Sequence, residues 1–189
     1  LSGLSVKITS LKDYKNMPAI IEDGKTFAQN AIIKACTIAQ VTKKLVLGED
    51  SGLEVKALNN KPGVFSARYA GKGSNANASD KANNFKLLRE LRGVPFKKRA
   101  ARYRCSVALA DKKGLVGVVS GSCSGLIGFC SKGRHGFGYD PLFVIEKYGK
   151  TFAELGLQIK HKMSHRYKAL KKTRRLMERY LKKYPPASS

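Results

Sequence analysis

Leu45-Val46-Leu47-Gly48-Glu49-Asp50-Ser51-Gly52-Leu53-Glu54-Val55 is the stretch that decides the fold. Its three leading apolar residues predict a buried strand, and residues 53–58 continue in extended form. Glu49 and Asp50 fall at the C-terminal end of the buried part. Because side chains at such strand ends line the crevice in which α/β proteins bind ligands, we expect Asp50 to belong to a ligand site.

Helical and extended patterns alternate on both sides of this strand. Residues 26–41 repeat apolar side chains at helical spacing, which predicts a helix. Further helices are expected over 79–91 and 164–184, and strands over 6–9, 101–110, 114–122, 125–129 and 142–145. Strands interleaved with helices, together with a hairpin turning at Asp111-Lys112-Lys113-Gly114, predict an α/β fold with a mixed sheet and flanking helices.

Size and composition indicate one globular domain over residues 1–189. The chain has 189 residues, 42% of them hydrophobic, so a sizeable core is expected. No apolar run approaches the roughly 20 residues of a membrane span, and we expect no membrane association. The four cysteines have no zinc-type spacing, which favours thiols in a cytoplasmic protein: Cys36, Cys105, Cys123 and Cys130.

The charge balance is strongly basic. Thirty-seven Lys and Arg against 13 Asp and Glu give a net charge of +24, which attracts polyanions. Nucleic acid, the ribosome and an anionic membrane are therefore open as partners. The alternative is a generally basic surface on an enzyme whose substrate is itself anionic, and the spread of basic residues along the chain favours it. Acid is scarce, and Glu22-Asp23 and Glu49-Asp50 are its only adjacent pairs.

Asp50 is the first candidate for metal chemistry. The residues after it, Ser51-Gly52, add a hydroxyl and a flexible backbone at the strand end. Carboxylate oxygens suit Mg²⁺, and Glu22, just before the first helix, is placed to supply a second carboxylate. Lys34 on that helix is placed to reach a phosphate as a point charge. A helix cap, a turn and a solvated lysine remain open as ordinary alternatives for these residues.

A second candidate cluster is Gly136-Phe137-Gly138-Tyr139-Asp140-Pro141. Its glycines let the backbone approach a flat ligand closely. Phe137 and Tyr139 offer stacking faces, and Asp140 offers an acceptor for N–H groups on a base edge. Further along, His165 and Arg166 begin a helix and are donors for carbonyl oxygens of a purine. A tight turn and a simple helix cap are the alternatives.

The order of the motifs is more informative than any one of them. The chain closely resembles the inosine/xanthosine triphosphate pyrophosphatase family, the noncanonical purine NTP pyrophosphatases, from about Val6 to the end of the last helix. The segments that carry the resemblance are Gly24-Lys25-Thr26-Phe27, Asn30-Ala31, Asp50-Ser51-Gly52-Leu53-Glu54-Val55, residues 62–71, residues 136–143, residues 150–155 and Ser164-His165-Arg166.

The resemblance implies hydrolysis of dITP/ITP and XTP to the monophosphate and pyrophosphate with Mg²⁺, which cleanses the nucleotide pool. It also implies a homodimer and a two-lobed mixed sheet with a central cleft. By position it implies Asp50 as proton acceptor and metal ligand, Glu22 as the other metal ligand and Glu49 as a possible further acid at the metal. It implies that Lys34 contacts phosphate. The residues that it implies for substrate binding are Ser51, Phe137, Gly138, Tyr139, Asp140, Lys160, His165 and Arg166.

One family feature is absent from this sequence. The family opens with a strand and a Thr-x-Asn-x-x-Lys loop that cradles the triphosphate, whereas Val6 here already matches the family's second strand. We therefore expect the sequence to be incomplete at its N-terminus, the alternative being a real loss of part of the phosphate-binding site.

Two other functional hypotheses stay open. One is a catalytically impaired relative acting as a basic nucleic-acid- or ribosome-binding protein, and the other is an enzyme for another nucleotide, such as a modified pyrimidine.

Overall fold

The computed structural model describes residue 4, residues 6–71 and residues 77–185. Contacts divide the chain into two compact units, and each is described by itself. Unit 1 comprises Leu1–Asp50, Ser106–Ser120 and Lys168–Ser189, and unit 2 comprises Ser51–Cys105 and Gly121–Tyr167. Neither unit is continuous in sequence, because the chain changes unit within three strands and within its last helix.

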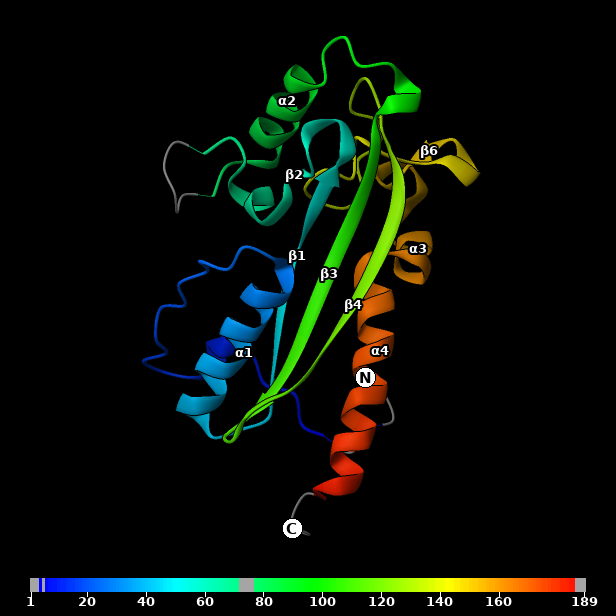
Figure 1. Ribbon diagram of the computed structural model, residues 1–189. Helices are drawn as coiled ribbons and strands as arrows, with labels where there is room; N and C mark the ends of the chain where they lie inside the picture. Colours follow the sequence, from blue (N-terminus) through cyan, green and yellow to red (C-terminus); the bar gives the residue numbers. More distant parts are fainter. Residues whose placement is uncertain (1–3, 5, 72–76, 186–189) are drawn as a thin grey trace. The chain divides into compact units, whose positions relative to one another are not determined.

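Helices and strands follow the order expected of an α/β chain (Figure 1). The α-helices are α1 (Phe27–Thr42), α2 (Asp80–Glu90), α3 (Phe152–Met163) and α4 (His165–Lys183). The strands are β1 (Val46–Val55), β2 (Lys61–Pro62), β3 (Ala100–Asp111), β4 (Gly114–Ile127), β5 (Phe143–Ile145) and β6 (Lys150–Thr151). Short 3-10 helices are η1 (Leu11–Asp13), η2 (Lys56–Leu58), η3 (Gly63–Arg68), η4 (Phe96–Lys98) and η5 (Glu146–Tyr148). Among the described helices, none is long and apolar enough to cross a membrane.

Two expected strands differ from those observed. Residues 6–9 belong to no helix or strand. The strand expected at 125–129 is the continuation of β4, which runs without a break to Ile127. The pattern of alternating apolar residues marks extended backbone but does not show where one strand ends and the next begins.

The six strands form one sheet in the order β2-β1-β3-β4-β5-β6. β1 pairs antiparallel with β2, and β5 pairs antiparallel with both β4 and β6. These pairings are antiparallel where a mixed sheet was expected. The connections from β1 to β2 and from β5 to β6 are short, and a parallel pair needs a crossover of about a dozen residues. The α/β class with flanking helices is confirmed.

In unit 1, α1 packs its small residues against the sheet. Thr26 caps the helix: its hydroxyl accepts from the Gln29 N–H at 3.2 Å, and the Gln29 side chain accepts from the Thr26 N–H at 3.0 Å. The buried alanines of α1 contact alanines of β3; this cluster is Ala31, Ala35, Ala39, Ala108 and Ala110. Short side chains on both surfaces let the helix lie close to the strands.

Gly48 of β1 is the closest point of that contact. A Cβ atom at Gly48 would clash with the Ala31 carbonyl oxygen and would lie 2.6 Å from the Ala35 backbone nitrogen. The obstacle is helix backbone, which cannot move aside as a side chain can. The face of β1 that carries Gly48 is therefore pressed against α1, and Asp50, two residues on, shares that face.

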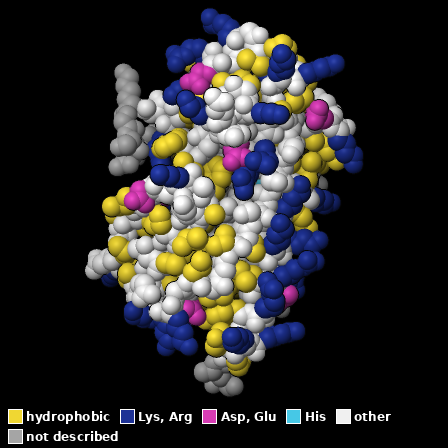
Figure 2. Space-filling model, viewed as in Figure 1, with side chains coloured by type: hydrophobic (Ala, Val, Ile, Leu, Met, Phe, Trp, Pro, Cys, Tyr) yellow, Lys and Arg dark blue, Asp and Glu magenta, His cyan; other side chains and the backbone are white. Residues whose placement is uncertain are grey.

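Lys and Arg side chains are spread over the face shown in Figure 2, with few acidic side chains among them. This agrees with their spread along the sequence, in which only the last helix concentrates them. Of the cysteines, Cys105 and Cys123 are buried, Cys36 is half-buried and Cys130 is exposed.

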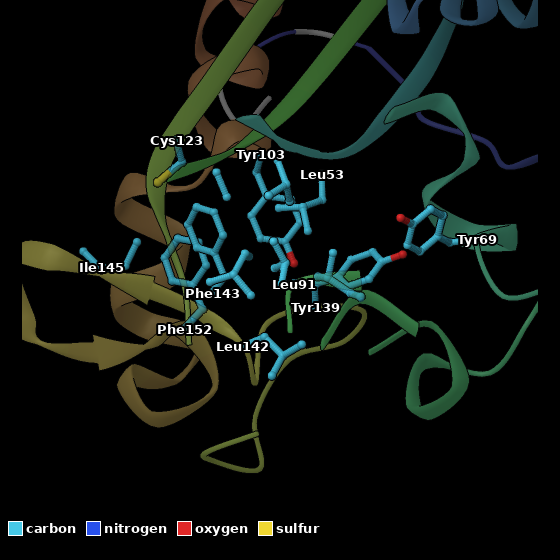
Figure 3. Packing of buried hydrophobic residues seen from close by; sticks show 14 residues of the cluster. Leu53, Tyr69, Leu91, Tyr103, Cys123, Tyr139, Leu142, Phe143, Ile145 and Phe152 are labelled. Atoms are coloured by element: carbon cyan, nitrogen blue, oxygen red, sulfur yellow. The ribbon is translucent and has the colours of Figure 1, made fainter. Parts of the chain in front are cut away.

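Aromatic rings form the core of unit 2 (Figure 3). The Tyr103 and Phe143 ring centroids are 4.6 Å apart, and those of Phe143 and Phe152 are 5.3 Å apart. Tyr139 and Leu142 belong to the same cluster, so the Gly136–Pro141 segment is anchored in the core at its C-terminal end. These rings give the loop a rigid base.

The contact at Gly48 predicts a large loss of stability when this glycine is replaced by alanine, the smallest substitution. We expect Gly48→Ala to lower the free energy of unfolding by about 2 kcal/mol or more, because the methyl group must displace helix backbone. Urea denaturation measures this. Gly128→Ala is the matched control, since its added Cβ would meet its nearest atoms at ordinary distances of 3.5 Å. An equal loss of unfolding free energy in the two variants would contradict the close approach of β1 to α1 at Gly48.

Candidate active site

In unit 1, one lysine joins two carboxylates. The Nζ atom of Lys34 lies 2.9 Å from Glu22 Oε2 and 3.0 Å from Asp50 Oδ1. The three residues expected to bind metal and phosphate are therefore side by side, although they come from a loop, a helix and a strand. Asp50 and Lys34 are mostly buried and Glu22 is half-buried, so the group keeps an opening to solvent.

Asn30 completes this group and was not predicted as a site residue. Its Nδ2 donates to Asp50 Oδ2 at 3.2 Å, and its Oδ1 accepts from the Gly24 N–H at 2.9 Å. Asn30 lies one helical turn before Lys34, so both face β1. It thus ties the segment carrying Glu22 to the strand carrying Asp50. The available sequence signal was an asparagine four residues before the lysine on the predicted helix.

Burial and charge oppose each other at this group. Burial raises the pKa of the Asp50 carboxyl above its ordinary value, although hydrogen bonds from Lys34 and Asn30 favour the ionised form. Burial alone would lower the pKa of Lys34, but its hydrogen bonds to Glu22 and Asp50 outweigh that effect and the pKa of Lys34 is raised. Lys34 therefore remains a cation at neutral pH.

Glu49 contacts the lysine through its backbone. Neighbouring side chains on a strand point to opposite faces, so the Glu49 carboxylate is turned away from the face of Asp50 and Gly48. It is the Glu49 carbonyl oxygen that accepts from Lys34 Nζ, at 3.1 Å. Glu49 therefore holds the lysine through its backbone, and its role as a further acid at the metal remains a prediction.

The donor set fits Mg²⁺. Within the part of the chain that the structure describes, no cluster of three or more His, Cys, Asp and Glu side chains is arranged to hold a metal ion. A closed site of the zinc type is thus not found there. Two carboxylates, Glu22 and Asp50, suit a magnesium ion that takes its remaining ligands from phosphate and water.

In unit 2, Asp140 organises the glycine-rich loop. Its carboxylate is 1% exposed; Oδ2 accepts from the Phe137 N–H at 2.9 Å and from the Lys160 ammonium, and Oδ1 accepts from the Tyr103 hydroxyl at 3.3 Å. Gly136 leaves room for this carboxylate, which a Cβ there would strike. Asp140 was expected to accept from a base edge, but its oxygens are engaged within the protein.

Phe137 is the aromatic residue that the loop leaves open. Its ring is 56% exposed, with Lys160 Nζ at 4.1 Å and the Arg166 guanidinium carbon at 5.5 Å from the ring centroid. Tyr139, by contrast, is 3% exposed and donates its hydroxyl to the Ser66 carbonyl at 2.9 Å. The prediction that Tyr139 presents a stacking face is wrong, because its ring is used to anchor the loop in the core.

Gly138 is fastened to α2 through both of its backbone groups. Its N–H donates to Asp80 Oδ2 at 2.6 Å, and its carbonyl accepts from Asn84 Nδ2 at 3.0 Å. Sequence reasoning missed Asp80 and Asn84, since nothing local marks a contact that spans more than 50 residues. Together these contacts fix the backbone on one side of Phe137 while its ring stays exposed.

The start of α4 faces the same loop. Ser164 caps the helix, accepting from the Tyr167 N–H at 3.2 Å. The His165 ring is stacked on Tyr103 at 4.7 Å, and Arg166 Nη2 donates to Ser51 Oγ at 3.1 Å. Ser51, His165 and Arg166 are thus brought together with the Phe137 loop, as their predicted roles require. Tyr103, which joins His165 to Asp140, was not predicted.

Each unit holds one part of the chemistry, and the boundary between them falls between Asp50 and Ser51, consecutive residues of β1. Unit 1 offers two carboxylates and a lysine, which suit a metal-bound phosphate. Unit 2 offers an exposed ring flanked by cationic donors, which suits a planar base with carbonyl groups. These are the parts that an α/β nucleotide-binding protein requires.

Comparison with known proteins places the chain within that class. A model of the Ham1 family matches residues 1–176, and the chain belongs to this family. It is 47% identical over 179 residues to a dITP/XTP pyrophosphatase of Desulforamulus reducens, covering 95% of this chain and 87% of the relative. A dITP/XTP pyrophosphatase of Geobacter sulfurreducens is 48% identical over 170 residues, with coverages of 90% and 83%.

Solved structures agree with the fold. The Staphylococcus aureus Ham1 protein superposes with a TM-score of 0.79 and 39% identity, covering 86% of this chain and 81% of that protein. A HAM1 protein from Coxiella burnetii gives a TM-score of 0.79 at 37% identity and covers 89% of each chain. The α/β fold expected from the sequence is therefore shared with Ham1 proteins.

The buried Asp140–Lys160 pair predicts an asymmetric response to mutation. We expect Lys160→Met to lower the free energy of unfolding by about 3–5 kcal/mol, because it leaves a buried carboxylate without its cation. Adding Asp140→Asn should restore part of that loss, since the uncompensated charge is then removed. Thermal and urea denaturation test both variants against Lys147→Met, which alters an exposed lysine. A double variant as unstable as Lys160→Met would contradict this role.

Proposed function

We propose that this chain hydrolyses noncanonical purine nucleoside triphosphates, dITP/ITP and XTP, to the monophosphate and pyrophosphate, and so cleanses the nucleotide pool. The observation that carries the proposal is the Lys34 ammonium held between the carboxylates of Glu22 and Asp50. Membership of the Ham1 family, with dITP/XTP pyrophosphatases at 47% and 48% identity, supports the same reaction. The enzyme is then a nucleoside-triphosphate pyrophosphatase.

Mg²⁺ is the proposed cofactor, with Glu22 and Asp50 as its protein ligands. When bound there it supplies charge neutralisation for the triphosphate and polarises the α-phosphorus. Lys34 is placed beside both carboxylates, from which it can turn its ammonium to the departing pyrophosphate as a point charge. Asn30 holds the second oxygen of Asp50 and keeps that carboxylate oriented while Lys34 moves.

Asp50 is the proposed proton acceptor for the attacking water. Burial raises the pKa of its carboxyl, which makes the ionised form a stronger base than an exposed aspartate. The hydrogen bonds from Lys34 and Asn30 keep that ionised form available at neutral pH. Asp50 would thus orient the water and take up its proton as the bond to the α-phosphorus forms.

The base is proposed to stack on Phe137, with donors from the start of α4 reading its edge. Hypoxanthine and xanthine carry a 6-oxo acceptor, which His165 and Arg166 can satisfy. Adenine carries an amino group at that position, so a buried donor would be left without an acceptor, and that loss rejects the wrong base. Asp140, Lys160, Tyr139 and Gly138 contribute by holding the Phe137 loop in place.

The oligomeric state, the location and the binding partners of the enzyme are also proposals. We infer a homodimer in the cytoplasm, acting on a purine nucleoside triphosphate, with nonspecific nucleic-acid association arising from the +24 charge. A catalytically impaired relative that only binds nucleic acid is the less favoured function, because Glu22, Lys34 and Asp50 are assembled together. A protein that no longer catalysed the reaction would not need to keep these three side chains together.

Removing either carboxylate tests the reaction. Asp50→Asn should lower Mg²⁺-dependent pyrophosphate release from ITP on the order of 10²- to 10⁴-fold, because the proton acceptor is lost. Glu22→Gln should raise the Mg²⁺ concentration needed for half-maximal activity, and a chelator should abolish activity in the unaltered protein. Asp13→Asn and Glu178→Gln are exposed controls of the same chemistry and should change neither quantity. Full activity in Asp50→Asn would exclude the proposed base.

Selectivity gives an independent test of the base site. His165→Ala and Arg166→Ala should each reduce the preference for ITP over ATP by about tenfold or more, since each removes a donor that only a 6-oxo purine satisfies. Steady-state kcat/KM for the two substrates measures this. Unchanged selectivity in both variants would instead favour the hypothesis of a modified pyrimidine substrate.

A further inference from the structure

A groove beside α2 in unit 2 contains none of the residues assigned to catalysis, although Phe85 at its edge also lines the neighbouring pocket of the Phe137 loop. It has a volume of about 540 Å³ and is bordered by α2, by the turn that follows α2 and by the segment just after β4. We call it the α2 groove and define it by Phe85, Arg89, Arg92, Arg99 and Phe129. None of these five residues has a role in the proposed pyrophosphatase reaction.

Two aromatic rings are exposed in the α2 groove. Phe85 is 67% exposed and Phe129 is 63% exposed. The Arg99 guanidinium lies 4.1 Å from the centroid of the Phe129 ring and is itself buried, donating to the Leu91 and Gly128 carbonyls at 2.8 and 2.9 Å. Phe129 therefore rests on a fixed cation and keeps most of its surface open. Large apolar side chains exposed in this way mark an interaction site.

The charge of the groove is positive and uncompensated. Arg89 and Arg92 are exposed on α2 and in the turn after it, and none of the residues that line the groove is acidic. The neighbouring acid, Glu90, is engaged elsewhere: it accepts from the Tyr69 hydroxyl and pairs with Lys86 at 4.0 Å. The groove thus offers aromatic faces and free positive charge together.

Charge complementarity decides which partner fits. A second copy of the chain that met this groove with its own groove would bring arginine against arginine across a self-complementary contact. A polyanion relieves that charge. Duplex nucleic acid hides the faces of its bases, so it leaves Phe85 and Phe129 without partners. A single strand offers phosphates to the arginines and unstacked bases to the rings.

We propose that the α2 groove binds single-stranded nucleic acid, with Phe85 and Phe129 stacking on bases and Arg89 and Arg92 contacting phosphates. This binding is additional to the pyrophosphatase reaction and does not depend on it. Stacking is tolerant of base identity, so the groove would bind with little sequence preference. RNA and DNA share the chemistry that the groove recognises.

Fluorescence anisotropy with labelled oligonucleotides of about 12 residues tests the proposal. Oligo(U), oligo(dT) and a duplex of equal length are titrated over a range of salt concentrations; the first two arms separate RNA from DNA. We expect either single strand to bind more tightly than the duplex. Phe85→Ala and Phe129→Ala should each weaken single-strand binding on the order of tenfold without changing its salt dependence, because stacking releases no counterions.

The arginines should behave differently. Arg89→Ala/Arg92→Ala should reduce the slope of log affinity against log salt by about 1.4, since each phosphate contact on a single strand contributes about 0.7. Lys171→Ala/Arg175→Ala on α4 removes the same charge elsewhere and should leave the slope within error. Tyr148→Ala is the control for loss of an exposed ring. Pyrophosphate release from ITP should be the same in all of these variants.

Several results would overturn the proposal. Equal binding of duplex and single strand, or equal effects of groove and control variants, would reduce the binding to general charge attraction. A change of oligomeric state in Phe85→Ala by size-exclusion chromatography, without loss of oligonucleotide binding, would assign the groove to a second copy. Loss of binding to phosphatidylserine vesicles with unchanged oligonucleotide affinity would assign it to a membrane. Should Phe129→Ala fail to fold, Phe85→Ala on the outer face of α2 gives the same test.

Discussion

The chemistry of unit 1 depends on the close passage of β1 against the backbone of α1 at Gly48. Only a glycine fits there, because any Cβ would enter the helix backbone. Alternation along the strand then turns Asp50 toward the same helix, where Asn30 and Lys34 lie one turn apart. The Lys34 ammonium offsets the charge of Asp50 and Glu22, so two acids can share a partly buried position. A packing constraint at one residue therefore sets the geometry of the candidate metal and phosphate site.

Unit 2 relies on a buried charge instead of a close backbone contact. Asp140 gathers the Phe137 N–H, the Lys160 ammonium and the Tyr103 hydroxyl around one carboxylate. A buried carboxylate needs this full set of partners, because leaving one out costs more than the pair contributes. The consequence is a loop whose polar groups are occupied internally and whose exposed feature is the Phe137 ring. Recognition of a base then rests on stacking and on donors from the start of α4.

Local pattern was enough to predict α1, α2, β1 and the β3–β4 hairpin, because each is marked by periodicity or by turn residues. It was not enough for the site. Composition left Lys34 close to an ordinary surface lysine, and only the order of motifs typical of the family placed it with Glu22 and Asp50. Tyr103 was missed, since its partners are distant in sequence. Tyr139 was misjudged for the same reason: tertiary packing, not its position in the motif, turns its ring into the core.

The central claim is attack of water on the α-phosphorus of a noncanonical purine triphosphate, directed by Asp50. The most direct measurement is ³¹P NMR of the products formed from ITP and Mg²⁺ in ¹⁸O-labelled water. We expect inosine monophosphate carrying the ¹⁸O atom, together with unlabelled pyrophosphate. Inosine diphosphate with labelled orthophosphate, or label in the pyrophosphate, would contradict it.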